Sequence, residues 1–215
     1  MFVFSSKTQV NKKFKLSELF KLISADKSVK ADARCVLSVV LSNVLSSATT
    51  NLPSKDGVRE IYIFDIELSE STIPQLFISS LDKVVRFHTV FVLHCGEKEM
   101  LCGAYKQMTD SNVKVGKYHL TKWRDASTPT SIPLDVSSLD DVYKAIMQEL
   151  VSMPARMDES ARAFVTRCEQ VAKLKKDIDK LQRQVDIEKQ SKIRFELNDE
   201  LKKLKKEMWL LNDKT

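Results

Sequence analysis

Alternation of apolar and polar side chains is clearest over residues 60–68, which read EIYIFDIEL. Every second position from Tyr62 to Leu68 is aromatic or aliphatic. The opposite positions begin with two isoleucines and end with Asp65 and Glu67. Because successive side chains of a strand point to opposite faces, the pattern predicts a β-strand. One of its faces is wholly apolar and the other becomes acidic toward its end.

Apolar residues at helical spacing predict further elements before residue 155. The expected helices cover residues 16–23, 28–46, 72–85 and 138–153. Period-two runs predict additional strands over residues 90–93, 100–105 and 113–120, the first two joined by a turn at Gly96. We therefore expect residues 1–155 to form a compact α+β domain, in which helices pack on one side of a small, mainly antiparallel sheet.

The composition changes after Asp158, beyond which no glycine or proline occurs. Two apolar runs then alternate by three and four residues, the a/d seam pattern of coiled coils. The seam positions are Val171, Leu174, Ile178, Leu181 and Val185 in the first run and Leu197, Leu201, Leu204, Met208 and Leu211 in the second. Residues 156–215 are therefore predicted to form a long, charged, coiled-coil helical tail.

The two seam runs are out of register, because Val185 and Leu201 would both be a positions yet lie 16 residues apart rather than 14. Either one helix continues with a phase slip, or the chain folds back between Ile187 and Arg194 as an antiparallel hairpin. We favour the hairpin because it buries both seams within one chain. An intermolecular coiled coil, and hence a homo-oligomer formed through the tail, remains an alternative.

Charge gives the tail a second candidate role. The chain has a net charge of +6, and residues 156–215 hold 16 basic and 12 acidic residues. The basic excess is concentrated in Lys202, Lys203, Lys205 and Lys206. Charged residues are usual on the solvated flank of a coiled coil, which is the simpler interpretation of these lysines. The alternative interpretation is that they contact DNA phosphates. Trp123 and Arg124 form a second candidate contact for a partner or a base, although a tryptophan there more often anchors a loop.

Cysteine usage and hydropathy indicate the compartment. Four cysteines lie far apart without a C-x-x-C pair, which indicates reduced thiols. The first residues lack the pattern of a signal peptide, and no apolar stretch approaches the ~20 residues that span a bilayer. We expect a soluble cytoplasmic protein with no membrane segment.

Asp65 and Glu67 are the best candidates for catalysis, because two carboxylates on one strand face can hold a divalent metal, as nucleases do. The nuclease pattern adds a lysine two residues after the second acid, where this chain has Ser69. Lys106, on a later strand, could take that place in space. The simpler interpretation is that both acids line the solvent face of a half-buried sheet.

Motifs of other enzyme classes are missing from the sequence. Four glycines in 215 residues cannot supply a Gly-rich phosphate loop. His94, Cys95 and Cys102 flank the expected hairpin turn, but their spacing matches no zinc site. The sequence therefore predicts no cofactor and no bound metal.

Four segments, taken in order, resemble the bacterial family called domain of unknown function 4391. They are Glu60–Leu68 (EIYIFDIEL), Leu81–Leu93 (LDKVVRFHTVFVL), Tyr118–Trp123 (YHLTKW) and Lys189–Lys206 (KQSKIRFELNDELKKLKK). The resemblance implies a small companion of DNA methyltransferases and helicases in restriction-type or phage-defence gene clusters. It also implies a lysine where this chain has Ser69, and that departure weakens a nuclease site.

Three functions follow as hypotheses. The leading one is a non-catalytic accessory or assembly subunit of a bacterial DNA-defence system, either restriction-modification or helicase-associated. Its protein partner would be a helicase or DNA methyltransferase of the same system, with DNA contact through the basic tail. The alternatives are a metal-dependent nuclease-like enzyme that uses the carboxylate pair, and a DNA-binding homodimer.

Overall fold

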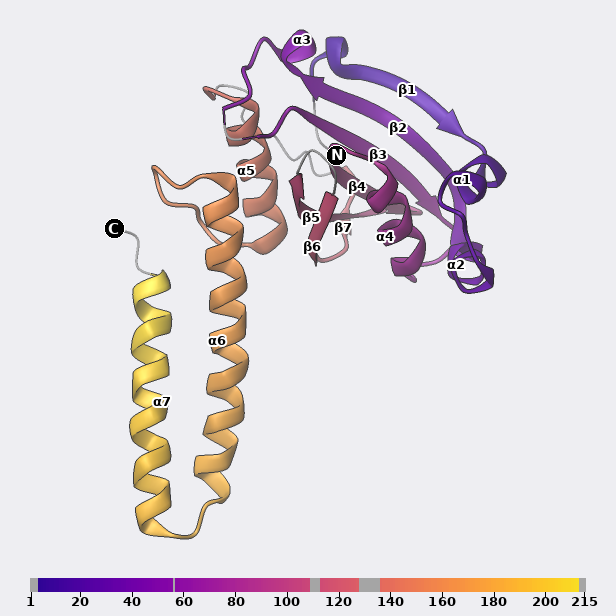
Figure 1. Ribbon diagram of the computed structural model, residues 1–215. Coiled ribbons are helices and arrows are strands. Elements are labelled where there is room, and N and C mark those ends of the chain that lie inside the picture. The colour runs from indigo at the N-terminus through magenta and orange to yellow at the C-terminus, as the bar shows by residue number, and fades with distance from the viewer. Residues whose placement is uncertain (1–3, 56, 109–112, 128–135, 213–215) are drawn as a thin grey trace. The chain divides into compact units, whose positions relative to one another are not determined.

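A computed structural model describes residues 4–55, 57–108, 113–127 and 136–212 (Figure 1). The chain divides into two compact units, unit 1 over Met1–Ser152 and unit 2 over Met153–Thr215. Among the described residues, none of the helices combines the length and the apolar character that a membrane span requires.

One mixed sheet forms the centre of unit 1. Its strands are Gln9–Phe14 (β1), Val36–Ser46 (β2), Glu60–Leu68 (β3), His88–Cys95 (β4), Lys98–Met108 (β5), Val113–Leu120 (β6) and Arg124–Asp125 (β7). The first six follow one another in sequence order across the sheet, and β7 pairs with β5. Among the described strands, β3 and β4 alone pair in parallel. The sheet is mainly antiparallel, as predicted, but it is larger than the small sheet we expected.

Helices cover both faces of this sheet. They are Leu16–Leu22 (α1), Lys27–Asp32 (α2), Ser47–Thr50 (α3), Gln75–Val84 (α4) and Leu139–Val151 (α5), with 3-10 turns at Ser6–Thr8 and Ala33–Cys35. The helix α4 is the crossover that the parallel β3–β4 pair requires. The helices predicted over residues 16–23, 72–85 and 138–153 are confirmed as α1, α4 and α5.

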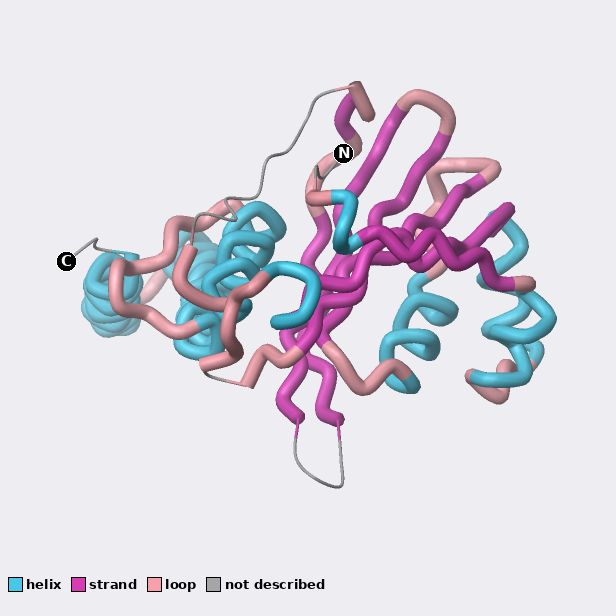
Figure 2. The backbone as a smooth tube through the Cα atoms, turned by 90° about the horizontal axis from the view of Figure 1, so that it is seen from above, coloured by secondary structure: helices cyan, strands magenta, loops and turns pink. Residues whose placement is uncertain are grey.

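The main core lies between the sheet and the helices α1, α2 and α4. Phe77 of α4 packs there with Phe64 of β3 and Phe91 of β4. The helix α5 lies on the opposite face (Figure 2), where the Tyr143 hydroxyl donates to the Ala104 carbonyl over 2.8 Å. The expectation that helices pack on one side is therefore wrong, because the second face of β3 is also apolar over half its length.

The helix predicted over residues 28–46 is also wrong, because α2 ends at Asp32 and the following residues form the long strand β2. The buried positions of β2 are Val36, Val39, Leu41 and Leu45. Their spacing departs from two because the pairing with β3 shifts register at two irregularities. Such bulges displace side chains by one residue, so a bulged strand of valines and leucines imitates helical spacing.

Unit 2 consists of two long helices, Ala161–Ile187 (α6) and Ser191–Asn212 (α7). The chain turns back across residues 188–190, between the two seam runs, and the helices lie side by side in opposite directions (Figure 1). Their shared apolar cluster contains Ile178, Leu181, Val185, Leu197, Leu201, Leu204 and Met208. Leu174 is also buried, while Val171 and Leu211 are half-buried.

Two arginines close the open end of this helix pair. Arg167 is 6% exposed, binds Glu159 through two hydrogen bonds of 2.6 and 2.7 Å, and donates to the Leu211 carbonyl over 3.2 Å. Arg156 donates to the Leu210 carbonyl over 3.0 Å. Both guanidinium groups therefore satisfy carbonyls at the C-terminal end of α7, where cations also interact favourably with the helix dipole.

Candidate functional site

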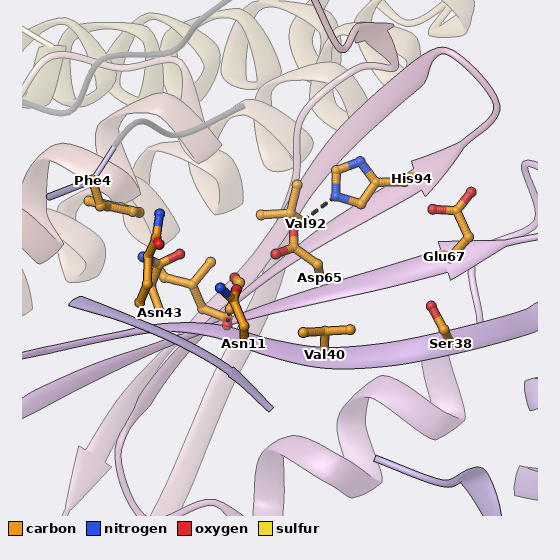
Figure 3. A pocket seen from close by; sticks show the side chains of 12 residues that line it. Phe4, Asn11, Ser38, Val40, Asn43, Asp65, Glu67, Val92 and His94 are labelled. Atoms are coloured by element: carbon orange, nitrogen blue, oxygen red, sulfur yellow. Dashed lines mark hydrogen bonds and ion pairs between the residues drawn. The ribbon is translucent and has the colours of Figure 1, made fainter. Parts of the chain in front are cut away.

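Asp65 and Glu67 line a pocket of about 550 Å³ on the sheet face opposite α4 (Figure 3). The pocket crosses β1, β2, β3 and β4, and its apolar wall consists of Phe4, Val40, Ile63 and Val92. Its other polar side chains are Gln9, Asn11, Ser38, Ser42, Asn43 and His94. This volume falls within the range of small-molecule sites.

Strand pairing determines which side chains meet in the pocket. In the β2–β3–β4 register, Glu67 lies between Ser38 and His94, and Asp65 lies between Val40 and Val92. The strand β1 adds Asn11, whose φ of 51° lies in the left-handed region that asparagine tolerates. These residues come from distant parts of the chain, so only the assembled sheet forms the pocket.

His94 is the functional candidate that sequence reasoning did not connect with the acids. Its Nε2 lies 2.8 Å from Asp65 Oδ1, and the two side chains are only 18% and 22% exposed. The hydrogen bond to Asp65 raises the pKa of His94, while burial opposes that shift and the charge of Glu67 adds to it. Such a carboxylate–imidazole pair can hold or transfer a proton near neutral pH.

The Asp65→Asn substitution is expected to lower the pKa of His94, because it removes both the strongest hydrogen bond to the imidazolium and a neighbouring charge. An NMR titration of the His94 ring protons would measure the change. Glu67→Gln is the matched control, with a smaller decrease because Glu67 acts only through its charge. An unchanged His94 pKa in Asp65→Asn would show that the pair does not form in solution.

Lys106, the proposed third member of a nuclease set, lies on the opposite face of the sheet. Its ammonium group is 2.7 Å from Asp82 Oδ1, and both side chains are fully buried. It also donates to the carbonyls of Asp82, Val85 and Phe87 over 2.7 to 2.8 Å. The structure therefore brings Asp65 and Glu67 together with His94 and separates them from Lys106.

The other contact candidates on unit 1 are engaged internally. Trp123 packs against the core beneath α4. Arg124 binds Glu99 through contacts of 2.9 and 3.0 Å and Glu149 over 3.2 Å. Trp123 therefore contributes to the core, and Arg124 links β7 to β5 and α5.

The four lysines of α7 differ in their contacts. Lys202 lies 3.5 Å from Asp199, and Lys205 donates to Gln182 of α6 over 3.2 Å. Lys203 and Lys206 are exposed. The lysines thus lie outside the apolar cluster, on the surface of the helix pair.

Across the described ranges, no three His, Cys, Asp or Glu side chains are placed together as a metal site. All four cysteines are free thiols. The strongest chemistry available to the pocket is therefore that of the Asp65–His94 pair beside Glu67.

Comparison with curated proteins and with solved structures finds no match in either set. The family model described as Domain of unknown function (DUF4391) matches residues 6–208. This match confirms the resemblance seen in the four sequence segments and extends through most of both units. The chain belongs to the DUF4391 family.

Proposed function

We propose that the protein is a non-catalytic accessory subunit of a bacterial DNA-defence system, and that unit 2 is its assembly element. The partner would be a helicase or DNA methyltransferase of the same system. Support comes from the family resemblance and from the surface of α7, whose large exposed side chains are those of an interaction helix.

Exposed aromatic residues on α7 carry this proposal. Phe195 is 65% exposed and Trp209 is 61% exposed. They lie 14 residues apart, so they occupy the same heptad position and the same helix face. Neither belongs to the cluster that packs against α6. Large exposed apolar groups mark contact surfaces, and tryptophan is enriched among the residues that dominate binding.

In this proposal the α6 and α7 seams pack as a coiled coil, which holds the Phe195–Trp209 face rigid. Lys202 lies midway between the two aromatic residues, at the same heptad position. Its charge would guide the approach of an acidic partner surface or of DNA. In the proposed assembly, the two aromatic side chains thus anchor the partner and the lysine between them supplies positive charge.

The double substitution Phe195→Ala and Trp209→Ala is expected to abolish co-purification of the partner, because it removes both anchors while leaving the seam intact. Each variant would be purified from the native host after nuclease treatment, and retained proteins identified by mass spectrometry. A control variant carries Leu22→Ala and Leu76→Ala, which remove two exposed residues of unit 1.

A helicase or methyltransferase that is retained by the double variant would contradict the assembly role of α7. If the chain purifies alone with twice its own mass and binds DNA with a steep salt dependence, the DNA-binding homodimer replaces the proposal.

The metal-dependent nuclease has less support, because Lys106 is buried on the other face of the sheet. Its remaining basis is that Asp65 and Glu67 share the pocket with His94. Two carboxylates with waters can hold Mg²⁺, so this alternative competes for the same pocket.

A further inference from the structure

The pocket across β1–β4 has a chemistry that the assembly role of unit 2 does not use. Two carboxylates, Asp65 and Glu67, line it, and no lysine or arginine is among the described residues that line it. Of the described lining side chains, only His94 can carry positive charge, and it is hydrogen-bonded to Asp65. Phosphates and other anions would therefore be repelled, whereas a cationic group would be attracted.

Several polar groups of the pocket already have partners in the fold. Asp65 binds His94, the Asn43 amide donates to Thr8 over 2.8 Å, and Ser42 donates to the Ile63 carbonyl over 3.2 Å. These bonds fix the shape of the pocket. They also identify the remaining side chains as those available to a ligand.

Glu67 stands out among those remaining side chains. Its carboxylate makes no hydrogen bond or ion pair with any residue in the described part of the chain, and the same holds for the side chains of Ser38 and Asn11. Figure 3 shows Glu67 and Ser38 at one end of the pocket and Phe4 at the other. A carboxylate without a hydrogen bond to the described residues thus lies in a concave site together with neutral hydrogen-bond acceptors.

We propose that this pocket binds an ammonium or guanidinium group, with the Glu67 carboxylate as its counter-charge. The hydroxyl oxygen of Ser38, which lies opposite Glu67 on β2, accepts a further N–H bond from the bound cation. A guanidinium suits a carboxylate especially well, because it can form two parallel hydrogen bonds.

An organic cation fits the pocket better than Mg²⁺ does. Mg²⁺ demands near-octahedral oxygen ligands at short distance, and one of the two carboxylates already accepts a hydrogen bond from His94. An ammonium or guanidinium group needs only one carboxylate and tolerates neutral acceptors. The same chemistry has two sources, a free polyamine and a lysine or arginine side chain of a partner protein.

Calorimetric titration of the full chain at low salt tests this proposal. The probes are spermidine for a free polyamine, and N-acetyl-arginine amide and N-acetyl-lysine amide for protein side chains. Saturable binding of at least one is expected, and the tighter of the two classes identifies the source. Glu67→Gln should weaken that binding about 10-fold or more, because a hydrogen bond to a charged group is lost.

Two further variants keep the test decisive. Glu97→Gln, in the exposed turn between β4 and β5, removes an equal charge away from the pocket and should leave affinity unchanged. Ser38→Ala should weaken binding, because it removes the hydroxyl acceptor opposite Glu67. Thermal unfolding would verify that each variant is folded.

The absence of saturable amine binding would overturn the proposal, as would binding that Glu67→Gln and Ser38→Ala leave unchanged. A parallel titration with Mg²⁺ and Mn²⁺ tests for a third result that would overturn the proposal. Metal binding that depends on Glu67 and excludes the amines would make the pocket a metal site. None of these results bears on the α7 surface, so the assembly proposal is tested separately.

Discussion

Replacing Lys106 with methionine is expected to lower the free energy of unfolding of unit 1 by about 3–5 kcal/mol. The substitution leaves the Asp82 carboxylate buried without its counter-charge. Burial raises the pKa of Asp82 and lowers that of Lys106, and each partner opposes the shift of the other. Both ions thus depend on their mutual contact.

Neighbouring groups increase the cost of losing Lys106. Hydroxyl groups of Thr89 and Tyr118 donate to Asp82, and three backbone carbonyls accept from Lys106. Methionine has a similar length but no donor, so these carbonyls lose a partner in a buried site. The network joins α4 to β4, β5 and β6, so its loss affects both the helix and the strands on that face of the sheet.

Urea denaturation followed by tryptophan fluorescence would measure this effect. A Trp209→Phe background leaves Trp123 as the single tryptophan, so the signal reports unit 1. Lys98→Met, an exposed substitution on the same strand, is the control and should change stability by about 0.5 kcal/mol or less. Equal midpoints for the two variants would show that the buried ion pair contributes little.

Much of unit 1 could be predicted because its signals are local. The alternation over β3, the turn at Gly96 and the serine that begins α5 each lie within a few residues of the element they define. The Ser138 side chain accepts from the Asp141 backbone N–H, as an N-cap should. Such features need no knowledge of the rest of the chain.

The errors concern features that depend on strand pairing. The bulges of β2 exist only against β3, so the sequence of β2 alone resembles a helix. Lys106 shares a strand face with Cys102, and only the pairing of Cys102 with Phe91 shows that this face lies against the main core and away from Asp65. His94 meets Asp65 only because β3 and β4 are parallel neighbours. A candidate site on a sheet therefore requires the register before its members can be named.

His88 is expected to make unit 1 less stable as the pH falls. Its ring packs 4.5 Å from that of Tyr143 and 5.6 Å from that of Tyr105, and the residue is 2% exposed. Burial, and then the positive charge of Lys106, lowers the pKa of His88 to about 4. In the unfolded chain a histidine takes up its proton near pH 6.5.

As the pH falls, His88 therefore takes up a proton in the unfolded state before it does so in the folded state. Stability is lost progressively from about pH 6.5 down to about pH 4, on the order of 3 kcal/mol in total and about 2 kcal/mol by pH 5. His94 acts in the opposite sense, because its raised pKa contributes stability at low pH that is lost as the pH rises through its folded value. The net slope combines these two histidines with other titrating groups, among them Asp82 with its raised pKa, so substitutions are needed to isolate His88.

Comparing His88→Phe with the parent chain isolates the contribution of His88. Phenylalanine preserves the ring packing against Tyr143 and cannot be protonated, so this variant should lose less stability than the parent between pH 7 and pH 5. The range stays above the pH at which ordinary carboxylates titrate. His94→Gln should steepen the loss, because it removes the opposing contribution. Parallel pH profiles for the parent and His88→Phe would mean that the folded state accommodates a protonated His88, through an opening of the α5 layer that buries it.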